Sequence, residues 1–273
     1  MDKSLFKGAE VQYGQDKKTK VYLASASLSR GQGQPGGQSV TASVRAARTA
    51  GLSETALNQL LILAVDYRLD DNDVVLLVHF LQTVQTDSLP IDPFMGKIEE
   101  GLAKRVPLDN IAAVLTHKLD DYRFVRQILS KKTGEQEITV HDLRRMVDSL
   151  DGGITREELD QFILEASGQD PAMLARAIEI LALLKQVGFN ESLAQEILFA
   201  GLRNNSLTQS WDYLARVVAT AKKRQISDDE IAKAAKKALE ANRSLEDFMT
   251  SLGFIPRDLR RSPATGQSAE RHQ

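Results

Sequence analysis

The chain has 273 residues, 42% of them apolar and 26% charged, so it is long enough to bury the core of one large domain or two ordinary ones. Its 35 Lys and Arg residues are mixed with 37 Asp and Glu residues, whereas a nucleic-acid-binding protein gathers positive charge on one face. The absence of cysteine excludes disulfides, thiolate nucleophiles and cysteine-ligated metals. No apolar run reaches the roughly 18–20 residues of a transmembrane helix.

The first residues, "MDKSLFKGAE", lack the apolar segment of a signal peptide. As the sequence stands, we therefore expect a soluble, cytoplasmic protein. The alternative is a periplasmic protein from which a signal peptide upstream of Met1 has been removed.

Residues 1–39 differ in character from the rest. Residues 20–27, "KVYLASAS", have the character of a short strand, and "RGQGQPGGQS" after them is typical of a flexible linker. The polar, proline-interrupted tail 256–273 is predicted to be disordered. Between these ends aromatic residues are scarce, and Ala, Leu, Glu, Lys, Arg and Gln are abundant. This composition predicts an all-α protein.

Four segments carry the pattern of a helix start, in which a hydroxyl residue is followed three positions later by an acidic one. The pairs are Thr139 and Asp142, Thr155 and Glu158, Ser227 and Glu230, and Ser244 and Asp247. In a capping box the hydroxyl and the carboxylate each accept one free backbone N–H of the first turn. Three of these starts follow an isoleucine in the position of a hydrophobic staple: Ile138, Ile154 and Ile226.

Residues 109–129 show how the helices are expected to bury their surface. Apolar residues recur there at steps of three and four and form one stripe, made of Ile111, Val114, Leu115, Leu119, Tyr122 and Val125. A single stripe needs a partner surface, so the helices are predicted to pack on one another.

The helical region carries signs of an internal duplication. "GLSETALNQLLILA" (51–64) aligns with "GITREELDQFILEA" (153–166), and Gly101-Leu102 aligns with Gly201-Leu202. We interpret this as a copied unit of roughly 90–100 residues. The expected fold is a helical-hairpin array or short α-solenoid. It comprises unit 40–129, unit 130–223 and a C-terminal hairpin 224–255. We expect the two glycines near helix ends, as left-handed caps.

The segment "IEEGLAKRVPLDNIAAVL" (98–115) resembles "EGLAKGVP"-like segments of uncharacterised helical bacterial proteins, which are often exported. The resemblance implies a helical bacterial protein and favours a place in the cell envelope. It implies no activity and no catalytic residue.

One segment, "VDSLDGGITREEL" (147–159), resembles half of an EF-hand calcium loop. With Gly152 at the glycine position, Asp151, Thr155 and Glu158 fall at ligand positions. The first ligand position is Val147, however, and a capping box after a Gly-Gly turn explains the same residues. Calcium binding by loop 151–158 is therefore the alternative hypothesis.

Acidic residues also gather at 70–75, "DDNDVV", where a helix N-terminus explains them better than a cation site. Of the four histidines, His79 is expected in a core or an interface, His141 in the first turn of a helix and His272 in the tail. His117 shares a helix face with Asp120 and Asp121, and we interpret this face as solvated.

Three further features favour structural interpretations. Trp211, which aligns with Ile111, is expected in the core. "RGQGQPGG" lacks the spacing of a phosphate-binding loop. The lysines and arginines around 221–240 alternate with acidic residues, so a solvated face is favoured over a nucleic-acid patch.

We therefore expect a non-enzymatic structural or protein-interaction module, with another protein as partner, a homo-oligomer as an option and no nucleic acid. No catalytic, cofactor-binding or metal-binding residue is assigned, and no cofactor is expected. A second alternative is a small-molecule-binding protein or enzyme with a pocket between the two helical units.

Overall fold

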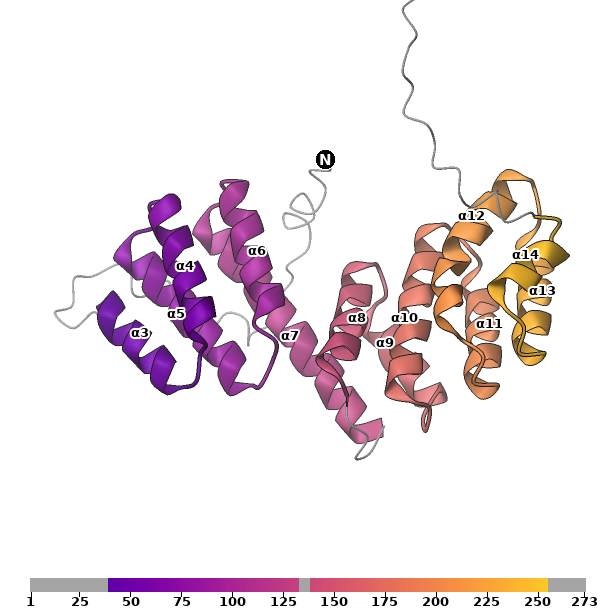
Figure 1. Ribbon diagram of the computed structural model, residues 1–273, viewed down its shortest axis with the longest axis horizontal. Helices are drawn as coiled ribbons and strands as arrows, with labels where there is room; N and C mark the ends of the chain where they lie inside the picture. The colour runs from indigo at the N-terminus through magenta and orange to yellow at the C-terminus, as the bar shows by residue number, and fades with distance from the viewer. Residues whose placement is uncertain (1–38, 133–137, 255–273) are drawn as a thin grey trace, which may run out of the picture. The chain divides into compact units, whose positions relative to one another are not determined.

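The computed structural model describes residues 39–132 and 138–254, and within them every regular element is helical (Figure 1). The elements are α3 (Val40–Thr49), α4 (Glu54–Asp66), α5 (Asp71–Thr86), α6 (Asp92–Ala103), α7 (Leu108–Lys132), α8 (Val140–Asp151), α9 (Arg156–Glu165), α10 (Pro171–Gln186), α11 (Glu191–Arg203), the 3-10 helix η2 (Gln209–Tyr213), α12 (Leu214–Lys223), α13 (Asp228–Glu240) and α14 (Leu245–Ser251). The all-α prediction is confirmed. The expected strand 20–27, the linker after it and the tail 256–273 lie outside the described residues.

The chain divides into two compact units, of which unit 1 ends at Leu119 and unit 2 begins at Asp120. The boundary lies inside α7, whereas the sequence placed it between 40–129 and 130–223. Segment 224–255, expected as a separate hairpin, contributes α13 and α14 to unit 2, because α13 packs against α11.

A charged contact explains why the second half of α7 belongs to unit 2. Asp121 is 2% exposed and accepts two hydrogen bonds from the Arg156 guanidinium at the start of α9, at 3.0 and 2.6 Å. The same guanidinium lies 5.3 Å from the centre of the Phe124 ring. A buried carboxylate needs such a partner, so this contact holds α9 against α7.

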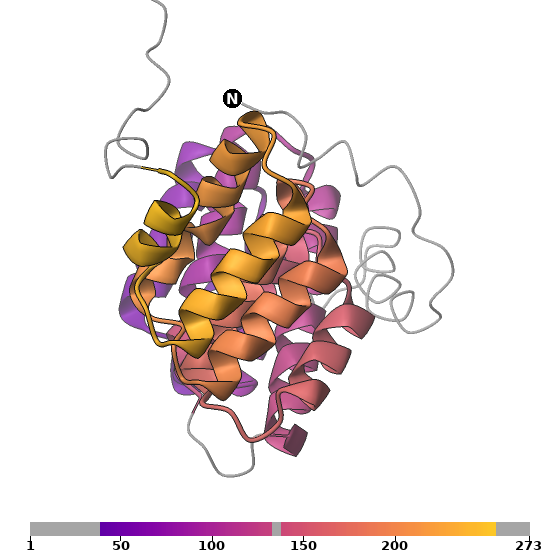
Figure 2. The same cartoon turned by 90° about the vertical axis from the view of Figure 1, so that its right-hand side faces the viewer.

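The most extensive contacts in each unit join helices two positions apart. In unit 1, α5 packs on α3, and α6 contacts α4. In unit 2, α10 packs on α8, α12 on α10, and α13 on α11, and the orange and yellow helices α11 and α13 lie side by side in Figure 2. Short connectors make successive helices antiparallel, so helices two positions apart run in the same direction. Each unit is therefore an array of helices, as the sequence predicted.

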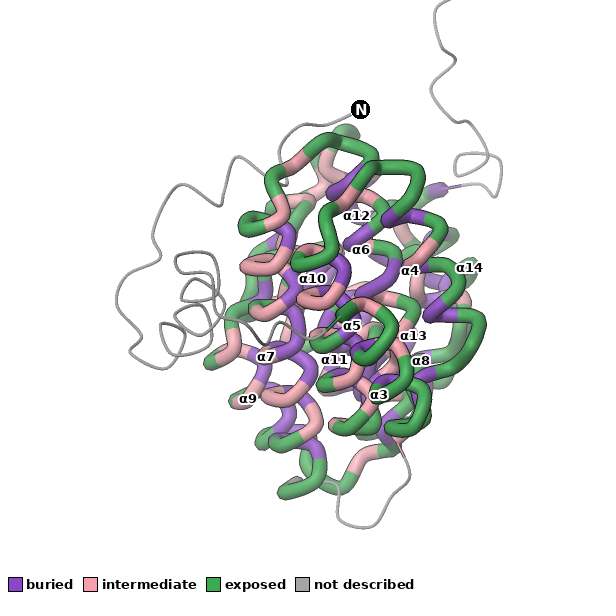
Figure 3. The backbone as a smooth tube through the Cα atoms, turned by 90° about the vertical axis from the view of Figure 1, so that its left-hand side faces the viewer, coloured by how far each residue is buried: buried purple, intermediate pink, exposed green. Residues whose placement is uncertain are grey.

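The burial pattern follows the expected helix faces (Figure 3). In α7, five of the six stripe residues are buried: Ile111, Leu115, Leu119, Tyr122 and Val125. Val114 is partly exposed. The capping boxes at Thr155, Ser227 and Ser244 are present, and Thr139 caps α8.

Many of the described connectors share one local structure, which segment 50–53 illustrates. Gly51 has a left-handed backbone (φ 90°), and its N–H binds a carbonyl of α3 at 3.1 Å, while the N–H of Leu52 binds a second carbonyl of α3 at 3.0 Å. This Schellman motif satisfies the last carbonyls of the helix. The Leu52 side chain is buried, and Ser53 caps α4 by accepting an N–H at 3.2 Å. The same pair of bonds ends α4, α5, α6, α8, α10, α11, α12, α13 and α14.

Gly101 and Gly201 do not form the left-handed caps expected from the sequence. Both lie inside the last turn of their helices, and the left-handed residues are Arg105 (φ 54°) and Asn205 (φ 52°). The glycines allow close packing instead. A Cβ at Gly101 would lie 2.7 Å from the Ile111 side chain, and one at Gly201 would lie 2.5 Å from the nearest side chain, that of Leu207.

Helices α3 to α6 and α8 to α11 follow the same order, with left-handed connectors between most of them. The order then diverges, because α7 is one continuous helix, whereas η2 precedes α12 in unit 2. The arrangement is the one that a duplication requires. The duplication itself stays a prediction, because equal helix order alone does not show common origin.

The close approach at the two glycines predicts that Gly101→Ala or Gly201→Ala lowers the free energy of unfolding by about 1–3 kcal/mol, the usual cost of overpacking. Gly96→Ala is the matched control in α6, since a Cβ at Gly96 would meet nothing within 4 Å. It should raise stability by about 0.5–1 kcal/mol through helix propensity. Urea denaturation measures all three. Equal effects of Gly101→Ala and Gly96→Ala would show that the close contact is unimportant.

Candidate binding groove

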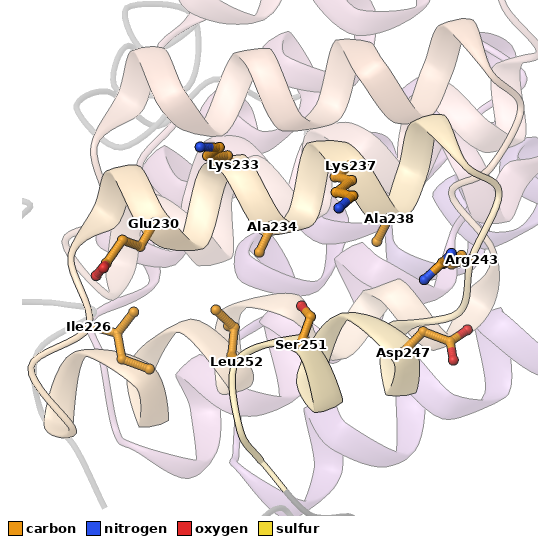
Figure 4. Close-up of a pocket in the computed structure, with 10 residues that line it drawn as sticks. All are labelled: Ile226, Glu230, Lys233, Ala234, Lys237, Ala238, Arg243, Asp247, Ser251 and Leu252. Carbon is orange, nitrogen blue, oxygen red and sulfur yellow. The ribbon is translucent and has the colours of Figure 1, made fainter.

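A groove lies between α13 and α14 in unit 2, with a volume of about 520 Å³ (Figure 4). Its lining comes from the two helices and the segments next to them: Ile226, Glu230, Lys233, Ala234, Lys237, Ala238, Arg243, Asp247, Ser251 and Leu252. The α13 residues recur at helical spacing and therefore belong to one face of that helix.

Local sequence fixes the two walls. Ser227 and Glu230 form the capping box of α13, and Ser244 and Asp247 form that of α14. Between the helices, Asn242 takes the left-handed conformation (φ 51°) and reverses the chain. The groove thus results from two capped helices joined by the connector described above.

The groove carboxylates are engaged in capping. Glu230 accepts hydrogen bonds from the Ser227 N–H at 3.2 Å and its hydroxyl at 3.0 Å. Asp247 accepts the Ser244 N–H at 3.1 Å and its hydroxyl at 3.0 Å. Each carboxylate has therefore used part of its capacity to accept hydrogen bonds before any ligand arrives.

The groove cations are not engaged in this way. The side chains of Lys233, Lys237 and Arg243 are exposed, and none makes an ion pair or hydrogen bond within residues 39–132 and 138–254. By contrast, Lys236 on another face of α13 binds Glu196 of α11 at 2.7 Å. Figure 4 shows Lys237 and Arg243 reaching toward the space between the helices.

Part of the groove lining is apolar. Ala234 and Ala238 of α13 face Ile226 and Leu252 across the groove, and the two alanines leave room for close approach (Figure 4). Ser251, the one hydroxyl in the lining, donates to the Phe248 carbonyl at 2.6 Å. The groove therefore offers apolar contact and positive charge, and its hydroxyl is bound to helix backbone.

The residues of the calcium hypothesis do not form a loop. Val147 and Ser149 are buried within α8, and Asp151 is its last residue. Glu158 accepts the Thr155 N–H at 2.7 Å and binds the Lys185 ammonium at 2.6 and 2.8 Å.

Electrostatics at Glu158 follow from these contacts. Burial raises the pKa of the carboxyl, but hydrogen bonds from Lys185 and from Thr155, together with the charge of Lys185, lower it by more, so the net shift is downward. The carboxylate is thus stabilised by an ammonium of its own chain, and capping explains the half-match to an EF-hand.

The acidic segment 70–75 is a helix start. Asp70 caps α5 by accepting the Asp73 N–H at 2.8 Å, and Asp71 and Asp73 lie in the first turn. Within the part of the chain that the structure describes, no group of three or more His, Asp or Glu side chains is arranged to hold a metal ion.

The described histidines belong to no such group either. His79 is exposed on α5 and therefore does not lie in a core. The apolar residues around it, such as Leu77, Val78 and Leu81, are buried on the other face of the helix. His141 lies in the first turn of α8, as expected, 3.7 Å from the Asp142 carboxylate. His272 lies outside the described residues.

The face expected to carry His117, Asp120 and Asp121 is divided. His117 is exposed and Asp120 partly exposed, whereas Asp121 is buried and bound to Arg156. The solvated-face interpretation therefore fails for Asp121. Its partner lies 35 positions away in the sequence, beyond any local pattern.

Trp211 is fully buried, as expected, and stacks on Phe248 of α14 with 5.6 Å between ring centres. Its indole N–H meets no acceptor among the described residues. The side chain therefore acts in packing, where it joins η2 to α14.

A cluster of four charged residues that the sequence did not indicate joins α8, α10 and η2. Arg145 binds Glu179 and also donates to Asp212 at 3.4 Å, while Arg176 donates to Asp212 at 3.2 Å and to the Leu207 carbonyl at 2.9 Å. The partners are separated by 31 to 67 positions, so no spacing reveals them. Both carboxylates are matched by guanidinium groups, which is typical of a structural cluster.

The chain matches no protein-family model, no curated protein and no solved structure. Among the described helices, none combines the length and apolar character needed to cross a membrane. The function must therefore be argued from the groove itself.

The depressed pKa of Glu158 gives a pH-dependent prediction. Because the folded pKa lies below the unfolded one, the group stabilises the fold above the unfolded pKa and loses that contribution as pH falls through the folded pKa. Lys185→Met should cost about 0.5–1 kcal/mol at neutral pH, as for other partly exposed ion pairs. It should also reduce the loss of stability between about pH 6 and pH 3. Urea denaturation across this range measures both effects.

Lys223→Met is the control, because Lys223 is exposed and makes no ion pair within the described ranges. It should follow the pH profile of the unmodified protein. One shared profile for all three proteins would contradict the role of Lys185.

Proposed function

We propose that this protein is a non-enzymatic protein-interaction module, in which the α13–α14 groove binds an acidic segment of a partner protein. The observation that carries the proposal is the net positive charge of the groove lining, which holds three cations and two carboxylates. Lys233, Lys237 and Arg243 are exposed and without partners among the described residues, whereas Glu230 and Asp247 are engaged in capping.

Charge and shape together favour a protein segment as ligand. A carboxylate placed between Lys237 and Arg243 would gain charge-assisted hydrogen bonds, each of about 1.5–3 kcal/mol. The apolar lining residues Ile226, Ala234 and Leu252 would bury an adjacent aliphatic side chain. A polyphosphate backbone uses no such apolar lining, and it would meet the carboxylates of Glu230 and Asp247.

The groove is less suited to catalysis or to a small molecule. Its hydroxyl, that of Ser251, is bound to the Phe248 carbonyl, and its lining contains no histidine to act as a base. A volume of about 520 Å³ falls within the range of small-ligand sites. The walls come from two helices and their flanking segments, however, whereas a small-molecule site surrounds most of its ligand.

The test is selection of peptides from a random display library on the immobilised full-length protein. We expect enrichment of peptides with net negative charge and at least one aliphatic residue. Their affinity should fall about tenfold or more in Lys237→Glu/Arg243→Glu, because attraction becomes repulsion. Binding is measured by fluorescence anisotropy of the enriched peptides.

Arg216→Glu/Lys223→Glu is the matched control, since it reverses two exposed charges on α12 that do not line the groove. It should leave binding unchanged. Enrichment of neutral or basic peptides, or equal losses in both double variants, would overturn the proposal.

A further inference from the structure

We infer that the occupant of the α13–α14 groove is an amphipathic α-helix that takes the position of the next helix in the array. This inference rests on the proposed function and names the class of segment that binds. It follows from the packing rule of the array, from the groove lining and from the distribution of charge along α13.

The packing rule leaves one helix face open. In unit 2, α8 is covered by α10 and α11 by α13, in each case by the helix two positions later. Only α14 follows α13 within the described residues, and it packs along one side of α13, so that part of the chain has no helix two positions after α13 to cover the rest of this face. The groove lies on this face, where a further helix would pack.

The lining has the shape that a helix requires. Residues 230, 233, 234 and 237 lie at helical spacing along α13 and form a ridge, and Ala234 and Ala238 are small enough for close helix approach. Leu252 and Ile226 provide apolar contacts on the opposite side. An apolar stripe at steps of three and four would fill this groove, with acidic flanks beside Lys233 and Lys237.

Charge along α13 also sets the direction of the occupant. Glu230 lies near the N-terminal end of the groove, and Arg243 lies just beyond the C-terminal end of α13. A helix parallel to α13 places its positive N-terminal end near Glu230 and its negative C-terminal end near Arg243. Helices two positions apart already run in the same direction within the array, so packing and charge agree.

Two other occupants fit less well. The tail of this chain carries Arg257, Arg260 and Arg261 followed by Pro263, so its charge matches the groove in sign and its proline opposes a helix. In a second copy, α3, the first described helix, presents exposed Arg45, which again has the sign of the groove. An acidic helix from a partner protein is the occupant that complements the groove.

The test uses two synthetic fluorescent peptides of the length of α13, 13 residues. One has leucines at helical spacing flanked by glutamates, and the other has the same composition in scrambled order. The ordered peptide should bind the full-length protein about tenfold more tightly, since only its apolar stripe can pack on the apolar lining. Circular dichroism should show helix forming on binding, because so short a peptide is largely unfolded when free.

The direction of the bound helix is tested by disulfide crosslinking. The chain contains no cysteine of its own, so each introduced thiol is unique. Asp229→Cys and Ala241→Cys place single thiols at the two ends of α13, outside the groove lining. A peptide with an N-terminal cysteine should form a disulfide mainly with the thiol at position 229. A peptide with a C-terminal cysteine should prefer position 241.

The outcomes separate this inference from the proposed function. If the ordered and scrambled peptides bind equally and both lose binding in Lys237→Glu/Arg243→Glu, the inference of a helical occupant is overturned. The proposal of an acidic ligand is then kept. The opposite crosslinking preference would overturn the direction. A dimer in analytical ultracentrifugation that dissociates in Lys237→Glu/Arg243→Glu would assign the groove to a second copy and overturn a partner helix. Lack of binding by both peptides would also overturn the inference, while the display selection tests the proposed function separately.

Discussion

The structure depends on one local device, the connector in which a left-handed residue, a second residue and a helix cap follow one another. In segment 50–53, Gly51 and Leu52 satisfy the last carbonyls of one helix, and Ser53 satisfies the first N–H groups of the next. So short a connection leaves the second helix no option but to run back along the first. Helices two positions apart then lie parallel, and their apolar stripes meet. The array is therefore a consequence of how most of the described helices end.

Charged contacts between residues far apart in the sequence determine where the helical array divides into units. Asp121 is buried in α7, and Arg156 supplies both its counter-charge and a cation–π contact with Phe124. Removing one partner of such a pair is costly, because the other charge stays buried. The contact therefore assigns the second half of one continuous helix to unit 2. The cluster around Asp212 acts similarly for η2, which it holds against α8 and α10.

Local features of the fold were predictable from the sequence, and distant ones were not. The capping boxes at Thr155 and Ser227 and the buried stripe of α7 depend only on residues three or four positions apart. The role of Gly101 was missed, because it depends on where the Ile111 side chain lies after the turn. The groove was missed for the same reason. Periodicity marks one face of α13 as polar, but it does not show whether another helix covers that face.

The groove arises where the regular pattern of the array stops. Capping rules place acidic residues at helix starts, so Glu230 and Asp247 are engaged by serine hydroxyls and backbone N–H groups. Elsewhere in unit 2, some lysines are met by acidic residues of a neighbouring helix, as Lys236 is by Glu196 and Lys185 by Glu158. On the open face of α13, no described helix supplies that partner to Lys233 or Lys237. The chain's overall charge is nearly balanced, yet the groove lining holds three cations and two carboxylates, and an acidic partner would complete both its packing and its ion pairs.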